Sequence, residues 1–289
     1  MFKKLTQIIT LSLVILMMAT PALADAVVGD EIISLGADLT VDQKNSILNE
    51  LDASNAEIIE VTNAEEHKYL GGIISSEKIG NIAISSAKLT ILNDGKGVDV
   101  DVSDNITYIT EEIYRNALIT AGIEDAEVKV TAPFKVTGTG ALTGIMKAYE
   151  TLTGESISDE VKKVANEELV ITTELSQQIG DIDTSKIVND IKIAFSENMP
   201  ETEEEARTII VNVSNNYNVN LTDSQVNQLV GLFMKMKNAN VDWDKVAKTA
   251  QKYSQDAVDY LATEDGQSFL QSIKVFFNSL IDWISNLFK

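Results

Sequence analysis

The chain has 289 residues, of which 44 are acidic and 23 basic, and it contains no cysteine and one histidine. Its hydrophobic (44%) and charged (23%) fractions are ordinary for a globular protein, which excludes a disordered, collagen-like or multi-span membrane chain. Without cysteine there are no disulfides, no thiolate metal sites and no lipid-modified N-terminal cysteine. A net charge of −21 repels phosphate backbones, so we expect no nucleic-acid partner.

Residues 1–24 have the pattern of a signal peptide. Lys3 and Lys4 precede an apolar run over 8–18, and Ala22-Leu23-Ala24 matches an A-x-A cleavage site. The run is short beside the roughly 20 apolar residues of a spanning helix, although an uncleaved anchor stays open as the alternative. We therefore expect a secreted or extracytoplasmic protein, associated with the cell envelope, that begins at Asp25. Cleavage removes two lysines and no acid, which leaves a net charge of −23.

Between residues 25 and 154, short β-rich runs alternate with helical patterns. We expect strands at 31–35, 57–61, 82–92, 98–102 and 126–130, and helices at 41–51, 64–70, 111–121 and 141–152. This order predicts an α/β (α+β) domain with a mixed sheet. Asp94-Gly95 and the following Gly97 predict a hairpin turn between two of the strands, because these residues tolerate positive φ. Gly122 is expected to end a helix.

From residue 155 onward the sequence predicts an all-helical domain, since only three of the 15 glycines follow Gly154. Helices are expected at 158–179, 184–198, 201–215, 223–238, 243–263 and 267–288. The acidic run Glu201–Glu205 follows Pro200 and opens a helix, where acids complement the dipole, so we do not read it as a site. Thr40 with Gln43 and Thr222 with Gln225 match capping boxes.

The predicted helix 267–288 carries an apolar stripe at three- and four-residue spacing, with polar positions on every turn. The polar positions exclude a membrane-spanning helix. Packing within the chain, peripheral membrane contact and self-association all remain open for it. The residues expected to make membrane or partner contact are Phe276, Phe277, Ile281, Trp283, Ile284 and Phe288.

Several ordered blocks resemble one known family. They are residues 61–70, 83–87, 116–123, 132–134 and 138–145. The chain resembles the YpuA-like proteins, a domain-of-unknown-function family of exported proteins in Gram-positive-type bacteria. The resemblance is densest from Gly36 to Glu150 and implies location and extent, and it carries over no catalytic residue.

The candidates for catalysis are Glu65, Glu66 and His67, which lie together on one predicted helix. His67 is the only histidine, so it can serve as a base with a carboxylate beside it, but it cannot build a multi-histidine zinc site. Packing or capping of the helix is the competing interpretation. The S-x-x-K fragments that start at Ser75 and Ser85 match serine acyl-transferases only by chance, because one lies in a predicted loop and the other in a strand.

Gly138-Thr139-Gly140 is the candidate ligand-binding segment. It follows a β-run and opens a helix, the context in which backbone N–H groups hold anions. The segment lacks the Lys-Ser/Thr of a P-loop, so a tight strand-to-helix turn, or contact with an anion or glycan, fits better than a nucleotide.

Four aspartates are the candidate metal ligands: Asp94, Asp99, Asp101 and Asp104. Their oxygen atoms suit Ca²⁺, but the EF-hand spacing is absent, so we expect no cofactor beyond weak calcium binding. Asp99 and Asp101 share one face of a predicted strand, and a solvated strand face is the simpler interpretation.

No complete catalytic set emerges from these patterns. We therefore predict an exported cell-envelope protein that binds or scaffolds an envelope component or a protein partner. A carboxylate-dependent hydrolase or transferase of the envelope is the alternative, because 44 acids can include a pair at glycosidase spacing.

Overall fold

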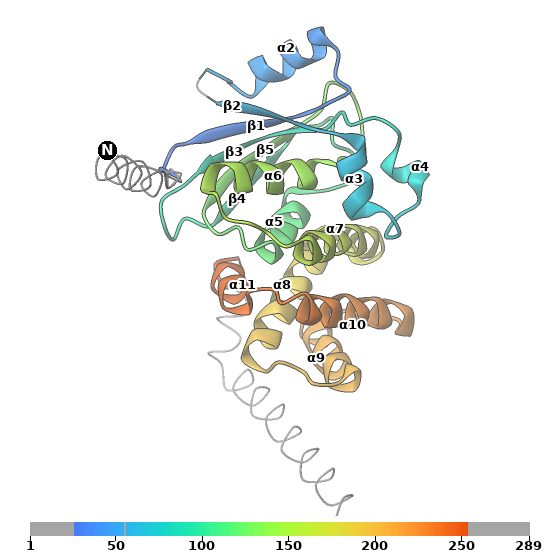
Figure 1. Cartoon of the computed structure of the whole chain (residues 1–289). Helices are drawn as coiled ribbons and strands as arrows, with labels where there is room; N and C mark the ends of the chain where they lie inside the picture. Colours follow the sequence, from blue (N-terminus) through green and yellow to red (C-terminus); the bar gives the residue numbers. More distant parts are fainter. Residues whose placement is uncertain (1–25, 55, 254–289) are drawn as a thin grey trace, which may run out of the picture.

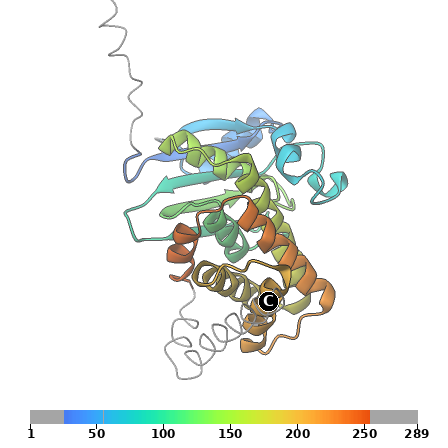
Figure 2. The same ribbon diagram turned by 60° about the horizontal axis from the view of Figure 1, so that its bottom comes forward.

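The computed structural model describes residues 26–54 and 56–253. A five-stranded sheet with helices on both faces forms one half, and a group of helices packs beneath it (Figures 1 and 2). The predicted signal peptide and the predicted helix 267–288, with its six contact residues, lie outside the described residues.

The sheet is mixed, as the sequence predicted. Its strands are β1 (Glu31–Gly36), β2 (Glu57–Val61), β3 (Ser86–Ile91), β4 (Val98–Val102) and β5 (Ala126–Thr131), in the order β2-β1-β3-β5-β4. β1 is parallel to β2, β5 is parallel to β4, and β3 runs antiparallel to both of its neighbours. Four of the five strands therefore end at the same edge of the sheet.

The predicted hairpin between β3 and β4 is wrong, because β5 lies between the two strands. The residues of the predicted turn form hydrogen bonds with Asp125, which directly precedes β5. The backbone N–H of Leu92 donates to the carbonyl of Asp125, and the N–H of Gly97 donates to the Asp125 carboxylate at 2.6 Å. The turn residues keep their positive φ (82° at Gly95), but the chain passes over β5 rather than reversing beside it.

The predicted strand 82–92 is shorter than expected and begins at Ser86. Residues before it cross the end of β1, where a Cβ on Gly36 would lie 2.3 Å from the carbonyl oxygen of Ala83. The Ala83 N–H donates to the Asp38 carboxylate at 2.7 Å. These contacts hold the segment away from the sheet ladder.

Helices cover both faces of the sheet. α6 (Ala141–Thr153) packs on β1 and β3, and α5 (Glu111–Thr120) packs on β4, on the same face. α2 (Val41–Glu50) lies over the opposite face, where Ile33 and Leu35 of β1 are buried (Figure 1). α3 (Asn63–Leu70) follows β2, and the short α4 (Ser76–Ile79) falls where the sequence predicted a loop.

The helical half contains α7 (Asp159–Ile179), α8 (Asp181–Glu197), α9 (Glu203–Asn216), α10 (Asp223–Asn238) and α11 (Trp243–Ala250). Within the described part of the predicted 243–263 helix, α11 ends at Ala250 and residues 251–253 form a turn, while 254–263 lie outside the described residues. α7 packs against α5, and α11 contacts both α5 and α8 (Figure 2). One buried apolar cluster continues from the sheet into these helices.

Local sequence signals set the helix ends as expected. The capping boxes of Thr40 and Thr222 are present, and Thr62 and Thr202 form two more. After α5, Gly122 adopts φ 83° and the Ile123 N–H donates to the Leu118 carbonyl, which is the Schellman arrangement.

A buried ion pair joins the two halves. The Lys192 ammonium of α8 lies 2.6 Å from the Glu168 carboxylate of α7, and neither side chain is exposed. Lys192 also donates to the backbone carbonyl of Asn116, and the Thr120 hydroxyl donates to Glu168, so both charges are held by α5. Burial raises the pKa of Glu168 and lowers that of Lys192, while each partner's charge opposes the shift of the other.

We predict that Lys192→Met destabilises the protein by about 3–5 kcal/mol, because it leaves Glu168 buried without its partner. Adding Glu168→Leu to the same chain should restore most of that loss. Urea unfolding of the wild type, the single variant and the double variant measures both changes. A loss below about 1 kcal/mol in Lys192→Met would contradict the structural role given to the pair.

Candidate functional site at the carboxyl ends of the strands

Two sets of candidate residues predicted separately from the sequence meet at one edge of the sheet. β1, β2, β4 and β5 all end there, and the segments that follow them carry α3 and the N-terminus of α6. α3 brings Glu65, Glu66 and His67, and the loop before α6 brings Gly138-Thr139-Gly140. In open sheets of this kind, ligands bind at the carboxyl ends of the strands. We call this edge the carboxyl-end site.

The closest approach is between Glu66 and Gly140. A Cβ built on Gly140 would lie 2.0 Å from Oε1 of Glu66, so the carboxyl group occupies the space that a side chain would need there. Glu66 is only 4% exposed. It occupies the buried face of α3 with Tyr69 and Leu70, three and four residues further along. The missing side chain at Gly140 therefore makes room for the carboxyl group.

The electrostatic surroundings of Glu66 oppose its ionisation. Burial raises the pKa of the Glu66 carboxyl to about 7, against a weak opposing hydrogen bond from the Asn63 amide at 3.3 Å. The negative charges of Asp38 and Glu65 raise the pKa further. The carboxyl group is therefore partly protonated near neutral pH, a property more common at functional sites than elsewhere.

The Gly138-Thr139-Gly140 loop is held from inside the protein. The Tyr114 hydroxyl of α5 donates to the Gly138 carbonyl at 2.5 Å, and Thr139 is 4% exposed. A Cβ on Gly138, whose φ is 90°, would lie 2.5 Å from the side chain of Ile106. The glycine at 138 is therefore required by packing and backbone conformation, and the arrangement fits the tight strand-to-helix turn expected from the sequence.

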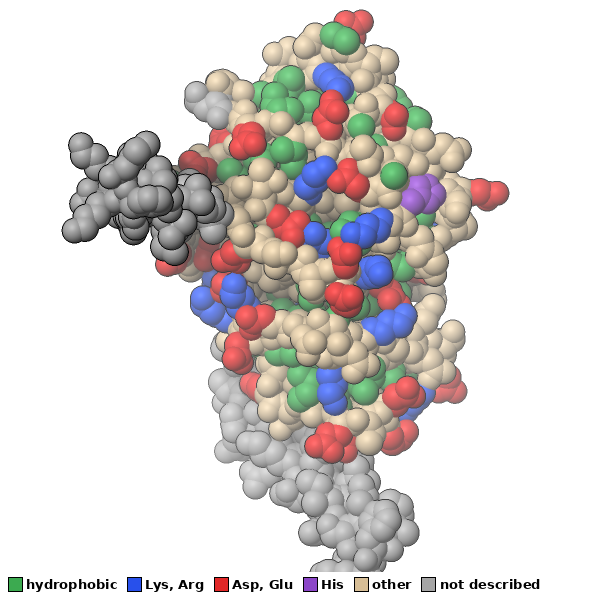
Figure 3. Space-filling model, viewed as in Figure 1, with side chains coloured by type: hydrophobic (Ala, Val, Ile, Leu, Met, Phe, Trp, Pro, Cys, Tyr) green, Lys and Arg blue, Asp and Glu red, His purple; other side chains and the backbone are tan. Residues whose placement is uncertain are grey.

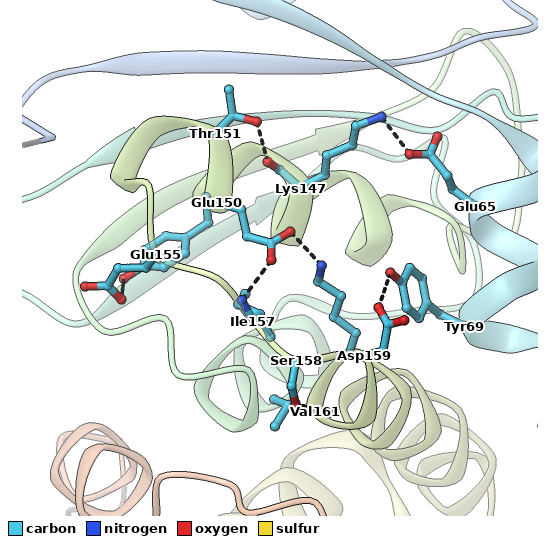
Figure 4. A network of polar contacts seen from close by, with 12 residues as sticks. Glu65, Tyr69, Lys147, Glu150, Thr151, Glu155, Ile157, Ser158, Asp159 and Val161 are labelled. Atoms are coloured by element: carbon cyan, nitrogen blue, oxygen red, sulfur yellow. Dashed lines mark hydrogen bonds and ion pairs between the residues drawn. The ribbon is translucent and has the colours of Figure 1, made fainter. Parts of the chain in front are cut away.

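Glu65, unlike Glu66, has a cationic partner. It completes the capping box of α3 with Thr62, and the Lys147 ammonium of α6 lies 2.7 Å from its carboxylate (Figure 4). Burial works against ionisation, but the hydrogen bonds from Lys147 and Thr62 hold the pKa of Glu65 below its ordinary value. Lys147 also donates to the backbone carbonyl of Glu60 at 2.8 Å.

Further ion pairs fix α3 and α6 against α7 (Figure 4). Glu150 of α6 accepts from the Lys162 ammonium at 2.6 Å and from the backbone N–H of Ile157 at 2.8 Å. The Tyr69 hydroxyl donates to the Asp159 carboxylate at 2.9 Å. These contacts tie α3 and α6 to α7, so three helices hold the segment that carries Glu65 and Glu66 in place.

The other catalytic candidates are engaged in structural contacts. The Nε2 atom of His67 lies 2.9 Å from the carbonyl oxygen of Gly80, which ties α3 to the loop after α4. Lys78 pairs with Glu174, and Lys88 pairs with Glu31 at 2.8 Å. The S-x-x-K fragment at Ser75 does span a turn of helix, α4, but its lysine is held by that ion pair.

The four aspartates proposed for calcium are spread along β4 and its flanking segments. Asp99 and Asp101 alternate with buried valines on β4 and are exposed, and Asp94 and Asp104 are exposed in the segments on either side. Within residues 26–54 and 56–253, no group of three or more acidic or histidine side chains is placed to hold a metal ion.

In the same ranges, none of the helices is both long and apolar enough to cross a membrane.

Comparison with known proteins places the chain in a family. The family described as "Protein of unknown function (DUF1002)" matches residues 35–253, so the chain belongs to this family. It is 45% identical over 280 residues to the "Uncharacterized protein YpuA" of Bacillus subtilis (strain 168), and the match covers 96% of each chain. This confirms the resemblance found in the sequence. No solved structure matches significantly.

Sequence reasoning did not separate Glu66 from Glu65, and it missed Asp38, Asn63 and Tyr114. The helical periodicity could have predicted that Glu66 is buried, because it lies three residues before Tyr69 on the same face of α3. Asn63 lies one helical turn before Glu66 on the same helix. Asp38 and Tyr114 come from distant segments, and their contribution depends on the strand order.

We predict that Glu66 makes stability depend on pH. Its pKa is about 7 in the folded protein against an ordinary value of 4.5, so between these values the folded state keeps a proton that the unfolded state has lost. Stability therefore falls as pH rises from about 4.5 through 7, by at most about 3 kcal/mol. Glu66→Gln should remove this loss.

Urea unfolding at pH 5 and pH 8 measures the effect. The matched control is Asp99→Asn, which removes one carboxylate from an exposed strand position and should keep the wild-type difference between the two pH values. Equal pH dependence in wild type and Glu66→Gln would contradict the assignment.

We also predict that Gly140→Ala destabilises the protein by about 1–3 kcal/mol, because the new methyl group displaces the Glu66 carboxyl. Combining it with Glu66→Ala should remove that penalty and give a coupling energy of about 1 kcal/mol or more in a double-mutant cycle. Additive effects of the two substitutions would show that the two residues do not touch.

Proposed function

We propose that this member of the family is an extracytoplasmic protein of the cell envelope that binds or scaffolds an envelope component or a protein partner without chemical conversion. One observation carries the proposal. The polar groups that catalysis would use are all engaged in hydrogen bonds or ion pairs within the protein: those of His67, Glu65, Lys78 and Lys88. A general base or a nucleophile must be available to its substrate. These four groups are already paired.

Export rests on the sequence of residues 1–24 and remains part of the proposal. The surface charge agrees with a protein that stays soluble outside the cell, because acidic and basic side chains are interspersed over the face shown in Figure 3. An acidic protein of this kind has little electrostatic attraction to anionic lipid. Membrane or partner contact would therefore rely on the apolar stripe of residues 267–288.

One observation favours the alternative, an envelope hydrolase or transferase. Glu66 is a buried carboxyl with a pKa of about 7, and the exposed carboxylate of Asp38 contributes to that value. A carboxyl group with a raised pKa near a second carboxyl group is the combination that acid-catalysed glycosyl transfer uses. In this alternative Asp38 takes the part that the sequence had suggested for Glu65.

We predict that the mature protein begins at Asp25 and co-sediments with envelope fragments of the bacterium that produces it, without releasing soluble product. Intact-mass measurement of the protein recovered from the envelope tests whether Asp25 is its N-terminal residue. Sedimentation, with assay of the supernatant for new reducing ends and amines, tests binding against conversion. Product that is lost in Glu66→Gln and kept in Asp99→Asn would establish the enzyme instead.

The same sedimentation assay tests the apolar stripe. Phe277→Glu with Ile281→Glu should reduce retention on the envelope if the stripe makes the contact, while Asn278→Glu with Asp282→Asn serves as the control on the polar positions. Retention that neither pair changes would move the contact to another part of the protein.

A further inference from the structure

We propose that the carboxyl-end site binds a primary ammonium group, which the Glu66 carboxylate receives beside Gly140 with the Thr143 hydroxyl as a second oxygen partner. The inference rests on the proposed binding function and names the chemistry of the ligand.

Among the described residues, one carboxyl oxygen of Glu66 accepts a hydrogen bond and the other does not. Oε2 accepts from the Asn63 amide at 3.3 Å, and Asn63 shares its amide with the carbonyl of Gly80. Oε1 lies against Gly140, and no described residue donates a hydrogen bond to it. A buried carboxylate is stable when it is paired with a cation or accepts several hydrogen bonds, and one long bond does not meet that need.

A second group near Glu66, the Thr143 hydroxyl, also lacks a hydrogen-bond partner among the described residues and independently supports a ligand here. Thr143 is 4% exposed. Gly140, Thr143 and Lys147 lie three and four residues apart, so they share one face of α6. That face is turned toward α3, because Gly140 meets Glu66 and Lys147 pairs with Glu65. Thr143 therefore lies on the side of α6 that is turned toward α3 and Glu66.

The charges around Glu66 favour the binding of a cation. Asp38 and Glu65 both act on Glu66 with negative charge, and the Tyr114 hydroxyl is committed to the carbonyl of Gly138. Lys147 is the cation on the facing surface of α6, and its ammonium is taken by Glu65 and by the backbone of Glu60. Among the residues that the structure describes, Glu66 therefore has no positive partner of its own.

An ammonium group fits these partners better than a metal ion or an anion. It has three N–H donors, which match Oε1 of Glu66, the Thr143 oxygen and one further acceptor. Calcium needs six to eight oxygen ligands, and among the described residues no three acidic side chains are placed to hold a metal ion together. An anion at the N-terminus of α6 would be repelled by Asp38, Glu65 and Glu66.

Binding of an ammonium ion should be linked to loss of the Glu66 proton. The carboxyl pKa of about 7 reflects burial without a cation, and a bound ammonium would lower it. Affinity for the ammonium should therefore rise as pH increases through about 7, until the amine itself begins to deprotonate.

The test uses propylammonium chloride and the mature full-length protein carrying ¹³C at the side-chain carboxyls of glutamate. NMR titration at constant ionic strength follows the Glu66 resonance, with potassium chloride as the salt control. We expect propylammonium to lower the Glu66 pKa by about one unit or more. We also expect Glu66→Gln to weaken binding at least about tenfold, as the loss of a charge-assisted hydrogen bond requires.

Two matched variants complete the experiment. Asp99→Asn removes the same charge from an exposed position and should leave affinity unchanged. Thr143→Val keeps the side-chain shape but removes the hydroxyl, so it should weaken binding several-fold without lowering stability.

An unshifted Glu66 resonance, or full binding by Glu66→Gln, would overturn the proposal, and so would displacement of propylammonium by millimolar calcium chloride. Any of these three results would leave the envelope sedimentation result untouched, since that assay does not depend on the identity of the bound group.

Discussion

Helix α5 is enclosed by the sheet on one side and by α7, α8 and α11 on the other, so its polar groups must find partners inside the protein. Each partner lies in a different part of the fold. Tyr114 donates to Gly138, Asn116 accepts from Lys192, and Thr120 donates to Glu168. The position of α5 therefore fixes both the loop of the carboxyl-end site and the attachment of the helical half.

At the carboxyl-end site, the ion pair and capping contacts of Glu65 lie next to a buried carboxyl group, Glu66, whose pKa is raised. Glu65 neutralises Lys147 and caps α3, and these contacts fix the helix so that the next residue points inward. Glu66 then lies against Gly140 with acidic neighbours and a single weak donor. Burial is the main reason that the pKa of Glu66 is raised, and the charges of Asp38 and Glu65 add to it. Two adjacent glutamates thus differ because one has a cationic partner and the other is buried among acids.

Much of the fold could be predicted because local signals agree with it. The strand at 57–61 and the helix at 223–238 were predicted with their observed bounds, and the capping boxes at Thr40 and Thr222 mark the starts of their helices. The prediction of a hairpin at Asp94-Gly95 was wrong, although the turn has the local backbone conformation that was expected. A turn signal states how the backbone bends, and it does not state which strand pairs beside it.

The sequence by itself determined the mixed α/β and helical character, most of the helix ends and two of the segments that meet at the site, Glu65–His67 and Gly138–Gly140. These properties depend on residues within about four positions of one another, where periodicity and capping act. Only the tertiary structure decided that β5 separates β3 from β4, that Gly140 meets Glu66 rather than Glu65, and that Lys192 is buried with Glu168. Those outcomes depend on which distant segments exclude water from one another, and burial of that kind has no short-range pattern in the sequence.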